Sequence, residues 1–456
     1  MIRFFRVNDP YRLVFVLLTL ITIRLTYIIV GMPLSMPEMK YLLLGEWLDN
    51  GFSMYKETFD YTAPLSAWTY QLMDYLFGNS RHAHWILSSF LVFFQAFRFN
   101  STLLKNKVFS ESNYVPAFLY VVFATSTFDF FALSPQLLSL TWVIISMDHL
   151  IRKMDNEAGD ELFLFPGFYL GLAVLFYFPS VSFFIVFLLA LVVITRAQPR
   201  RIFLFIFGYA TVFLFVLVVL YLLGSLASFW EVYFVELYRE KTFYFSYATL
   251  AVWVSFPALF FIIALVTALG RREGSLHAKT QQFMLLVLFA SLSVVLLSGT
   301  LSGSDLLFFI PVFTFFITNY VLKINKLIWR IVVPNLLIIS AVILPALGLR
   351  LPQLNDGLVI ETMASDSRFE NKRIMIMGPL QSEYLLGQMS SPFIDERISQ
   401  MRLQELDYYH TAPLFLKILR EANPEVILDE WNQMPKILER FPELEEKNFD
   451  LKVISN

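Results

Sequence analysis

The chain has 456 residues, of which 57% are hydrophobic and only 16% are charged. Soluble domains are usually about 45 to 50% apolar and about 25% charged, so this composition excludes a single water-soluble core and predicts an α-helical integral membrane protein. The 35 basic residues nearly balance the 37 acidic ones, which argues against a nucleic-acid partner, and the lack of cysteine excludes disulfides, thiolate nucleophiles and cysteine-ligated metal sites.

Eleven apolar runs are predicted to span the membrane, because a spanning helix needs about 20 mostly apolar residues. The first is predicted to be a retained anchor, since it is long and has no small-residue cleavage site. The runs cover residues 12–31, 82–103, 114–128, 132–150, 162–178, 180–196, 202–224, 247–270, 281–299, 303–322 and 330–350.

The loops between these runs alternate between basic and non-basic, and short cytoplasmic loops collect Lys and Arg. One set of alternate loops carries 17 basic residues: Arg3, Arg6, Arg12, Arg98, Lys105, Lys107, Arg152, Lys153, Arg196, Arg200, Arg201, Arg271, Arg272, Lys279, Lys323, Lys326 and Arg330. The other set carries five: Lys40, Lys56, Arg81, Arg239 and Lys241. We therefore predict an inner (plasma) membrane protein with a cytoplasmic N-terminus and an extracytoplasmic C-terminal segment.

The segment 63–77 is apolar but too short to span, and it contains Asp74. If it did span, every later loop would change sides and the basic clusters would lie outside. We predict an interfacial amphipathic helix within the first external loop.

Charged residues return after residue 350, where short apolar runs alternate with helical patterns. Residues 372–378, 425–429 and 450–455 are predicted strands, and residues 411–422 and 433–446 are predicted helices. This order predicts a small α/β domain with a parallel sheet. The predicted division is a transmembrane domain, 1–350, and an extracytoplasmic domain, 351–456, for which the plain interpretation is a structural or docking role.

The first external loop, Met32 to Arg81, is long enough to suggest a function. Its carboxylates could activate a hydroxyl or amine acceptor as a general base, or hold a divalent cation. They could equally be solvated helix faces and caps, so a metal site stays open. The acidic residues are Glu38, Glu46, Asp49, Glu57, Asp60 and Asp74.

The first external loop has a recognisable order of residues: Glu38, Tyr41, Gly45 or Gly51, Tyr55, Glu57, Pro64-Leu65 and Phe77-Gly78-Asn79-Ser80. This pattern resembles the GT-C superfamily of membrane glycosyltransferases, which includes lipid A aminoarabinose transferases and protein O-mannosyltransferases. The resemblance implies a multi-span bundle with interfacial helices and a sugar donor linked to polyprenyl phosphate.

Two positions depart from the family's acidic pattern. The usual acidic pair of the loop reads Pro37-Glu38 here, and Pro135-Gln136 lies near the slot of a second acid. Either Glu38 takes over the role of the catalytic base, with Asp129 or Glu57 as a partner, or the chain is a catalytically silent relative of this superfamily.

A phosphate-linked donor needs positive charge near the outer interface. Arg24 is the foremost candidate because an arginine within a span is costly, although it could instead extend its head to the interface. Asp305 is interpreted as a helix cap. The predicted substrate contacts are Arg24, Lys56, Arg81, Arg239, Lys241 and, by resemblance, Tyr55.

Two functions remain open from the sequence. The first is a GT-C-like glycosyltransferase that transfers a sugar from a polyprenyl-phosphate donor to an acceptor outside the membrane. The second is a catalytically inactive scaffold that binds envelope proteins through residues 351–456. A transporter is disfavoured, because no paired internal repeat is evident.

Overall fold

The computed structural model describes residues 2–154, 160–237, 242–243, 247–270, 274–324, 332, 335–336, 339–340, 360, 369–379, 382–404 and 411–441. The chain divides into two compact units. Unit 1 comprises Met1–Met32, His82–Val216 and Glu240–Leu358, and unit 2 comprises Pro33–Arg81, Leu217–Arg239 and Val359–Asn456.

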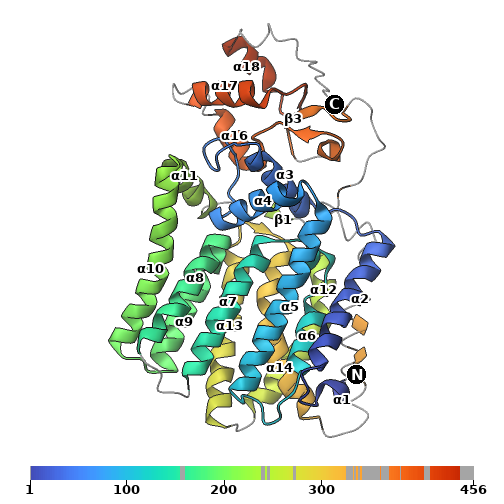
Figure 1. The fold of residues 1–456 in the computed structure, drawn as a ribbon, viewed down its shortest axis with the longest axis vertical. Helices are drawn as coiled ribbons and strands as arrows, with labels where there is room; N and C mark the ends of the chain where they lie inside the picture. Colours follow the sequence, from blue (N-terminus) through green and yellow to red (C-terminus); the bar gives the residue numbers. More distant parts are fainter. Residues whose placement is uncertain are drawn as a thin grey trace. The chain divides into compact units, whose positions relative to one another are not determined.

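Unit 1 is a bundle of long helices (Figure 1). Its short elements lie at helix ends: α1 (Ile2–Phe5), η1 (Phe128–Phe131), η2 (Asp160–Phe163), η3 (Phe178–Ser180), η4 (Gly303–Phe309), and the paired strands β1 (Thr242–Phe243) and β2 (Thr300–Leu301). The α-helices lying wholly or mostly in this unit are α2 (Arg12–Val30), α5 (Arg81–Lys105), α6 (Val115–Phe123), α7 (Pro135–Lys153), α8 (Leu164–Phe176), α9 (Val181–Val193), α10 (Pro199–Leu222), α12 (Tyr247–Leu269), α13 (Ser275–Leu297) and α14 (Ile310–Leu322).

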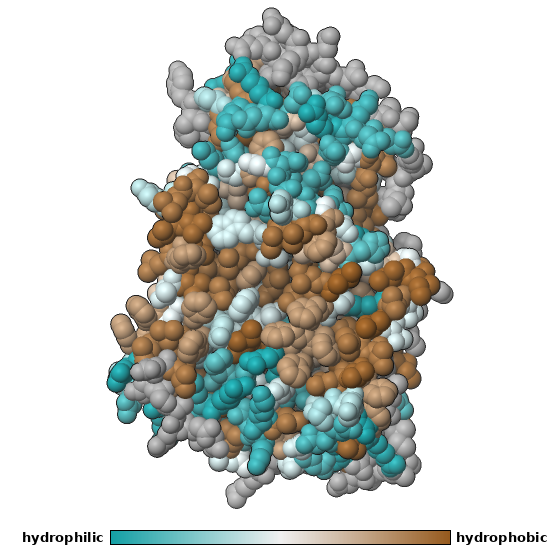
Figure 2. Space-filling model, viewed as in Figure 1, coloured by the Kyte–Doolittle hydropathy of each residue, from teal (hydrophilic) through white to brown (hydrophobic). Residues whose placement is uncertain are grey.

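Four helical stretches of the described residues are long and apolar enough to cross a membrane: Arg12–Val30, Pro199–Leu222, Ser275–Leu297 and Gly303–Leu322. Apolar side chains cover much of the outer surface of the bundle (Figure 2). Many of them are exposed, for example Leu18 and Ile29 on α2 and Phe207 and Phe215 on α10. The chain is thus a helical membrane protein, while the number of eleven spans stays a prediction.

The predicted run 114–128 differs most from a simple span. Its helix, α6, has nine residues, and all nine are buried. A helix of this length extends only ~14 Å, less than half of the hydrocarbon thickness of a bilayer. Most of the predicted run 330–350 lies outside the described residues.

Unit 2 joins the first loop to the C-terminal segment. It contains α3 (Met36–Asp49), α4 (Pro64–Phe77), α11 (Leu226–Leu237), η6 (Ser382–Leu385), α16 (Glu396–Gln404), α17 (Thr411–Ala422), α18 (Met434–Arg440) and the strands β3 (Arg373–Met377), β4 (Gln388–Met389) and β5 (Val426–Asp429).

The three strands of unit 2 form a parallel sheet in the order β4-β3-β5. Ile374 pairs with Val426, and Met377 pairs with Asp429. The predicted parallel sheet is therefore confirmed, although β4 was not foreseen, since two residues carry no readable alternation. The predicted strand 450–455 lies outside the described residues.

Helices α3 and α4 pack closely. A Cβ atom on Gly45 would lie 2.7 Å from the Tyr70 carbonyl oxygen, so only glycine permits this approach. The rings of Tyr41 and Tyr70 stack with their centroids 5.1 Å apart. The predicted helix 63–77 is thus present as α4, and its exposed Tyr75 and Phe77 suit a membrane interface, where its location stays a prediction.

Candidate functional site

Glu38 and Arg81, both predicted as site residues, form an ion pair within unit 2. Arg81 donates from Nε and Nη2 to the two carboxylate oxygens of Glu38, at 3.0 and 2.9 Å. Arg81 Nη2 also donates to the Pro33 carbonyl oxygen at 2.6 Å, and Glu38 is buried. The bidentate contact fixes the Glu38 carboxylate and neutralises its charge.

Glu57 is paired with a residue of the C-terminal segment. Its Oε1 accepts from Lys417 Nζ at 2.9 Å, and its Oε2 accepts from the Ser53 backbone N–H at 2.9 Å. Burial acts to raise the pKa of Glu57, but the hydrogen bonds from Lys417 and Ser53 outweigh it and lower the pKa. Glu57 is therefore a stabilised anion that ties α17 to the first loop.

Tyr55 and Lys56 differ sharply in burial. The Tyr55 hydroxyl donates to the Thr62 carbonyl oxygen at 2.7 Å, and burial, with Asp60 nearby, raises its pKa well above the usual value. Tyr55 also has a φ of 69°, a left-handed conformation that is costly for a bulky residue. Lys56 is exposed. Tyr55 thus supports the loop, and Lys56 points to solvent.

A buried lysine lies between two carboxylates of unit 2. Lys40 Nζ is 2.6 Å from Asp60 Oδ1 and 3.7 Å from Asp395 Oδ2, and it lies 3.9 Å from the centre of the Tyr61 ring. All three charged side chains are buried. This group joins α3 to the segment before α16, a contact that no local pattern predicts.

Two further acids of the loop, Asp74 and Glu46, have raised pKa values. Burial raises the pKa of Asp74 to about 6, and the nearby Asp49 contributes to the shift. Burial also raises the pKa of Glu46, although its oxygens accept from the Met389 backbone N–H and from Asn79. Most of the six loop acids thus take part in separate contacts, whereas Asp49 is exposed.

Arg24 is buried inside unit 1, with 4% of its surface exposed. Its Nη1 donates to the carbonyl oxygen of Trp85 and to the hydroxyls of Ser88 and Ser89, at 3.3, 3.1 and 2.8 Å. Its Nη2 donates to the Phe130 carbonyl oxygen at 3.3 Å. The guanidinium group thus lies among protein atoms rather than on the surface of the bundle.

All of these acceptors are neutral, and Arg24 Nε is buried without a hydrogen-bond partner in the described part of the chain. No ion pair among the described residues includes Arg24. A buried cation without an anion is costly, so Arg24 is the basic residue best suited to receive an external anion.

Asp129 lies in η1, next to Phe130. Its Oδ2 accepts from the backbone N–H of Ser304 at 2.8 Å and from the Ser304 hydroxyl at 3.1 Å. A Cβ atom on Gly303 would lie 2.8 Å from this oxygen, so glycine is needed for the contact. Asp129 thus fastens η1 to the start of η4.

Asp305 has a larger role than its sequence position indicated. The expected helix cap is confirmed, because Ser302 and Asp305 form a capping box at η4. Its carboxylate also accepts from Tyr177 Oη at 2.5 Å and from Gln136 Nε2 at 3.1 Å. Only the fold reveals these contacts, since the partners are 128 and 169 residues away.

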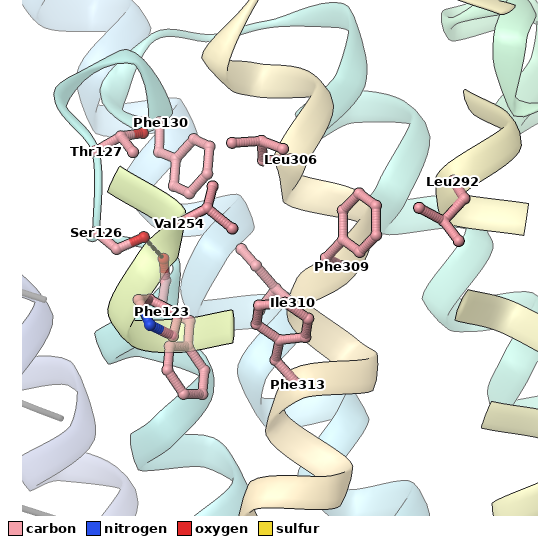
Figure 3. Close-up of a pocket in the computed structure, with 11 residues that line it drawn as sticks. Phe123, Ser126, Thr127, Phe130, Val254, Leu292, Leu306, Phe309, Ile310 and Phe313 are labelled. Atoms are coloured by element: carbon pink, nitrogen blue, oxygen red, sulfur yellow. Dashed lines mark hydrogen bonds between the residues drawn. The ribbon is translucent and has the colours of Figure 1, made fainter. Parts of the chain in front are cut away.

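An apolar pocket of about 240 Å³ lies in unit 1 between α6, α12, α13 and α14 (Figure 3). Thr127 contributes a buried hydroxyl that has no hydrogen-bond partner. Phe130 also lines the pocket, and its carbonyl oxygen accepts from Arg24. The lining residues are Phe123, Ser126, Thr127, Phe130, Val254, Pro257, Leu292, Leu306, Phe309, Ile310 and Phe313.

Two predicted substrate contacts, Arg239 and Lys241, lie outside the described residues. Within the described part of the chain, no group of three or more His, Cys, Asp or Glu side chains is arranged to hold a metal ion. The predicted residues that the structure joins directly are Glu38 and Arg81.

No curated protein matches this sequence. Residues 56–347 match a family of unknown function, DUF6427. The match extends from the first loop through α14, which is most of the helical bundle. The chain therefore belongs to the DUF6427 family.

Proposed function

We propose that this chain is a GT-C-like glycosyltransferase that moves a sugar from a polyprenyl-phosphate donor to an acceptor on the outer side of the membrane. The observation that carries the proposal is Arg24, a buried guanidinium whose hydrogen-bond partners among the described residues are all neutral. Guanidinium groups bind phosphate through several N–H donors at once. A lipid phosphate would supply the charge that this buried cation lacks.

The apolar pocket supports the same class of donor. Its walls are apolar side chains within the bundle, which suits a hydrocarbon chain better than a polar ligand. Phe130 links the two features, because its ring lines the pocket and its carbonyl oxygen binds Arg24. An amphiphile with a phosphate and an isoprenoid chain has both groups that these features would accept.

In the proposed reaction an acceptor oxygen forms a bond to the sugar's anomeric carbon as the bond from that carbon to the phosphate oxygen breaks. The acceptor proton passes to Glu38, and polyprenyl phosphate leaves with the electron pair. Glu38 would have to exchange its contact with Arg81 for the acceptor, since a carboxylate in a bidentate ion pair is a weak base.

The test is transfer from radiolabelled undecaprenyl-phosphate hexoses by the purified protein. We expect label to leave the carrier with the wild-type chain, and at least tenfold more slowly with Glu38→Gln or Arg24→Gln. Arg12→Gln is the matched control on the same helix, because Arg12 lies at the predicted cytoplasmic end. Full activity of Glu38→Gln would remove Glu38 from the mechanism.

A second function, the inactive scaffold, is favoured by the ion pairs of the predicted acids. The predicted acids form ion pairs, Glu38 with Arg81 and Glu57 with Lys417. Such pairs are more typical of a structural role than of exposed catalytic groups. Such a scaffold would bind envelope proteins through residues 351–456. It predicts that undecaprenyl-phosphate hexoses stay intact with every variant, whereas release of label from the carrier by the wild-type chain would contradict it.

A further inference from the structure

Asp305 is a fully buried carboxylate that the proposed reaction does not use. It lies at the start of the stretch Gly303–Leu322, which is apolar enough to cross a membrane. Ionisable residues inside a membrane bundle are expensive and usually have a specific role. The contacts of this side chain therefore indicate what it binds.

Four segments supply the contacts of Asp305. Tyr177 follows α8, Gln136 is the second residue of α7, Ser298 follows α13 and Ser302 precedes η4. Besides Tyr177 and Gln136, the carboxylate accepts from the Ser302 backbone N–H at 3.0 Å and from the Ser298 hydroxyl at 3.3 Å. Every one of these partners is neutral.

The hydrogen-bond donors around Asp305 are arranged as for a charged acceptor. Tyr177, Gln136, Ser298 and the Ser302 backbone N–H all donate to its two carboxylate oxygens. None of the ion pairs formed by the described residues includes Asp305. These partners can stabilise a charge on the carboxylate, but they do not neutralise it.

The surroundings of Asp305 are rich in oxygen. Hydroxyls of Tyr177, Ser298 and Ser302 lie within 3.5 Å of the carboxylate. Gln136 is buried, and its Oε1 has no hydrogen-bond partner among the residues that the structure describes. A half-turn of the carboxamide exchanges its oxygen and nitrogen, so this oxygen can also face the carboxylate.

We propose that Asp305, Gln136, Tyr177, Ser298 and Ser302 form a binding site for a monovalent cation, with Na⁺ as the natural candidate. One carboxylate balances one positive charge, whereas a divalent ion prefers several carboxylates among its oxygen ligands. The bound ion would hold the ends of α7, α8, α13 and η4 together. This proposal does not depend on the transfer reaction.

The test is the thermal unfolding of the purified full-length protein in NaCl, compared with choline chloride at equal ionic strength. We expect Na⁺ to raise the midpoint of unfolding in a saturable manner, because it binds only the folded state. Asp305→Asn should lose this response. The control Glu111→Gln removes an exposed carboxylate of the same unit and should keep it.

A milder variant keeps the test decisive if Asp305→Asn does not fold. Tyr177→Phe removes one oxygen ligand, so the half-saturating Na⁺ concentration should rise about tenfold. An unchanged value would contradict the site. The proposal is also overturned if the wild-type midpoint does not respond to Na⁺, or if it responds to pH alone, which would assign a proton to Asp305.

Discussion

The two units differ in the partners of several of their buried charged side chains. In unit 2, Glu38, Lys40 and Glu57 each have a partner of opposite charge within the unit. In unit 1, the described partners of Arg24 and Asp305 are all neutral. A charge that the chain neutralises itself acts in the fold, whereas a charge held by neutral groups leaves room for an ion from outside.

Unit 1 also contains an internal contrast. Asp148 on α7 is paired with Arg98 at 2.6 Å and with Arg152 at 2.8 Å. The bundle can therefore neutralise a buried carboxylate where its own charges suffice. The lack of such partners at Arg24 and Asp305 is a local property of these two sites among the described residues.

The largest expected effect is the loss of Lys40. Lys40→Met leaves Asp60 and Asp395 buried without this cation and should reduce the free energy of unfolding by about 3 to 5 kcal/mol. Lys56→Met is the matched control, since Lys56 is exposed and should change stability by less than about 0.5 kcal/mol. Chemical unfolding of both variants measures the difference, and equal losses would contradict the pairing.

The next effect concerns the pocket of unit 1. Leu292→Trp should fill the pocket and weaken the binding of undecaprenyl phosphate about tenfold, or about 1.4 kcal/mol. Leu296→Trp lies one helical turn away, outside the pocket. Both leucines are exposed, at 45% and 69%, so neither change should disrupt the core. Equal affinities of the two variants would exclude the pocket as the chain site.

A smaller effect is the pH dependence of unit 2. Because the folded-state pKa of Asp74 is raised to about 6, the folded form binds a proton that the unfolded form releases. Stability should therefore fall as pH rises from about 4 to about 6, by about 1 kcal/mol for this half-buried group. Unfolding across this range should show a weaker slope in Asp74→Asn and in Asp49→Asn. Unchanged slopes would refute the assignment.

The smallest effect is expected at the exposed end of the Glu57 pair. Lys417 is 54% exposed, so Lys417→Ala should lower the stability only slightly, and 1 M salt should reduce the difference. Because the pKa of Glu57 is lowered, its contribution is present above its unfolded pKa and disappears as pH falls through the folded value. The free energies of unfolding of the wild-type chain and Lys417→Ala can be compared at two salt concentrations and at acidic pH. A difference that persists under all of these conditions would contradict the expectation.

Patterns along the chain predicted the helices and the parallel strands, because periodicity and apolar length are local properties. They also identified Glu38, Arg81 and Arg24 as unusual residues. The partners could not be predicted, since Glu38 and Arg81 are 43 residues apart and Gln136 and Asp305 are 169 apart. The joining of the first loop to the C-terminal segment depends on other long-range contacts, those of Lys40 with Asp395 and of Glu57 with Lys417.

Whether an unneutralised charge in unit 1 binds an external ion is tested most directly by lipid binding to the full-length protein. Native mass spectrometry can compare undecaprenyl phosphate with the neutral alcohol undecaprenol, for the wild-type chain, Arg24→Gln and Arg12→Gln. We predict that the wild-type chain and Arg12→Gln prefer the phosphate, and that Arg24→Gln loses this preference. Equal binding of both lipids to the wild-type chain, or a preference kept by Arg24→Gln, would contradict the proposed role of Arg24.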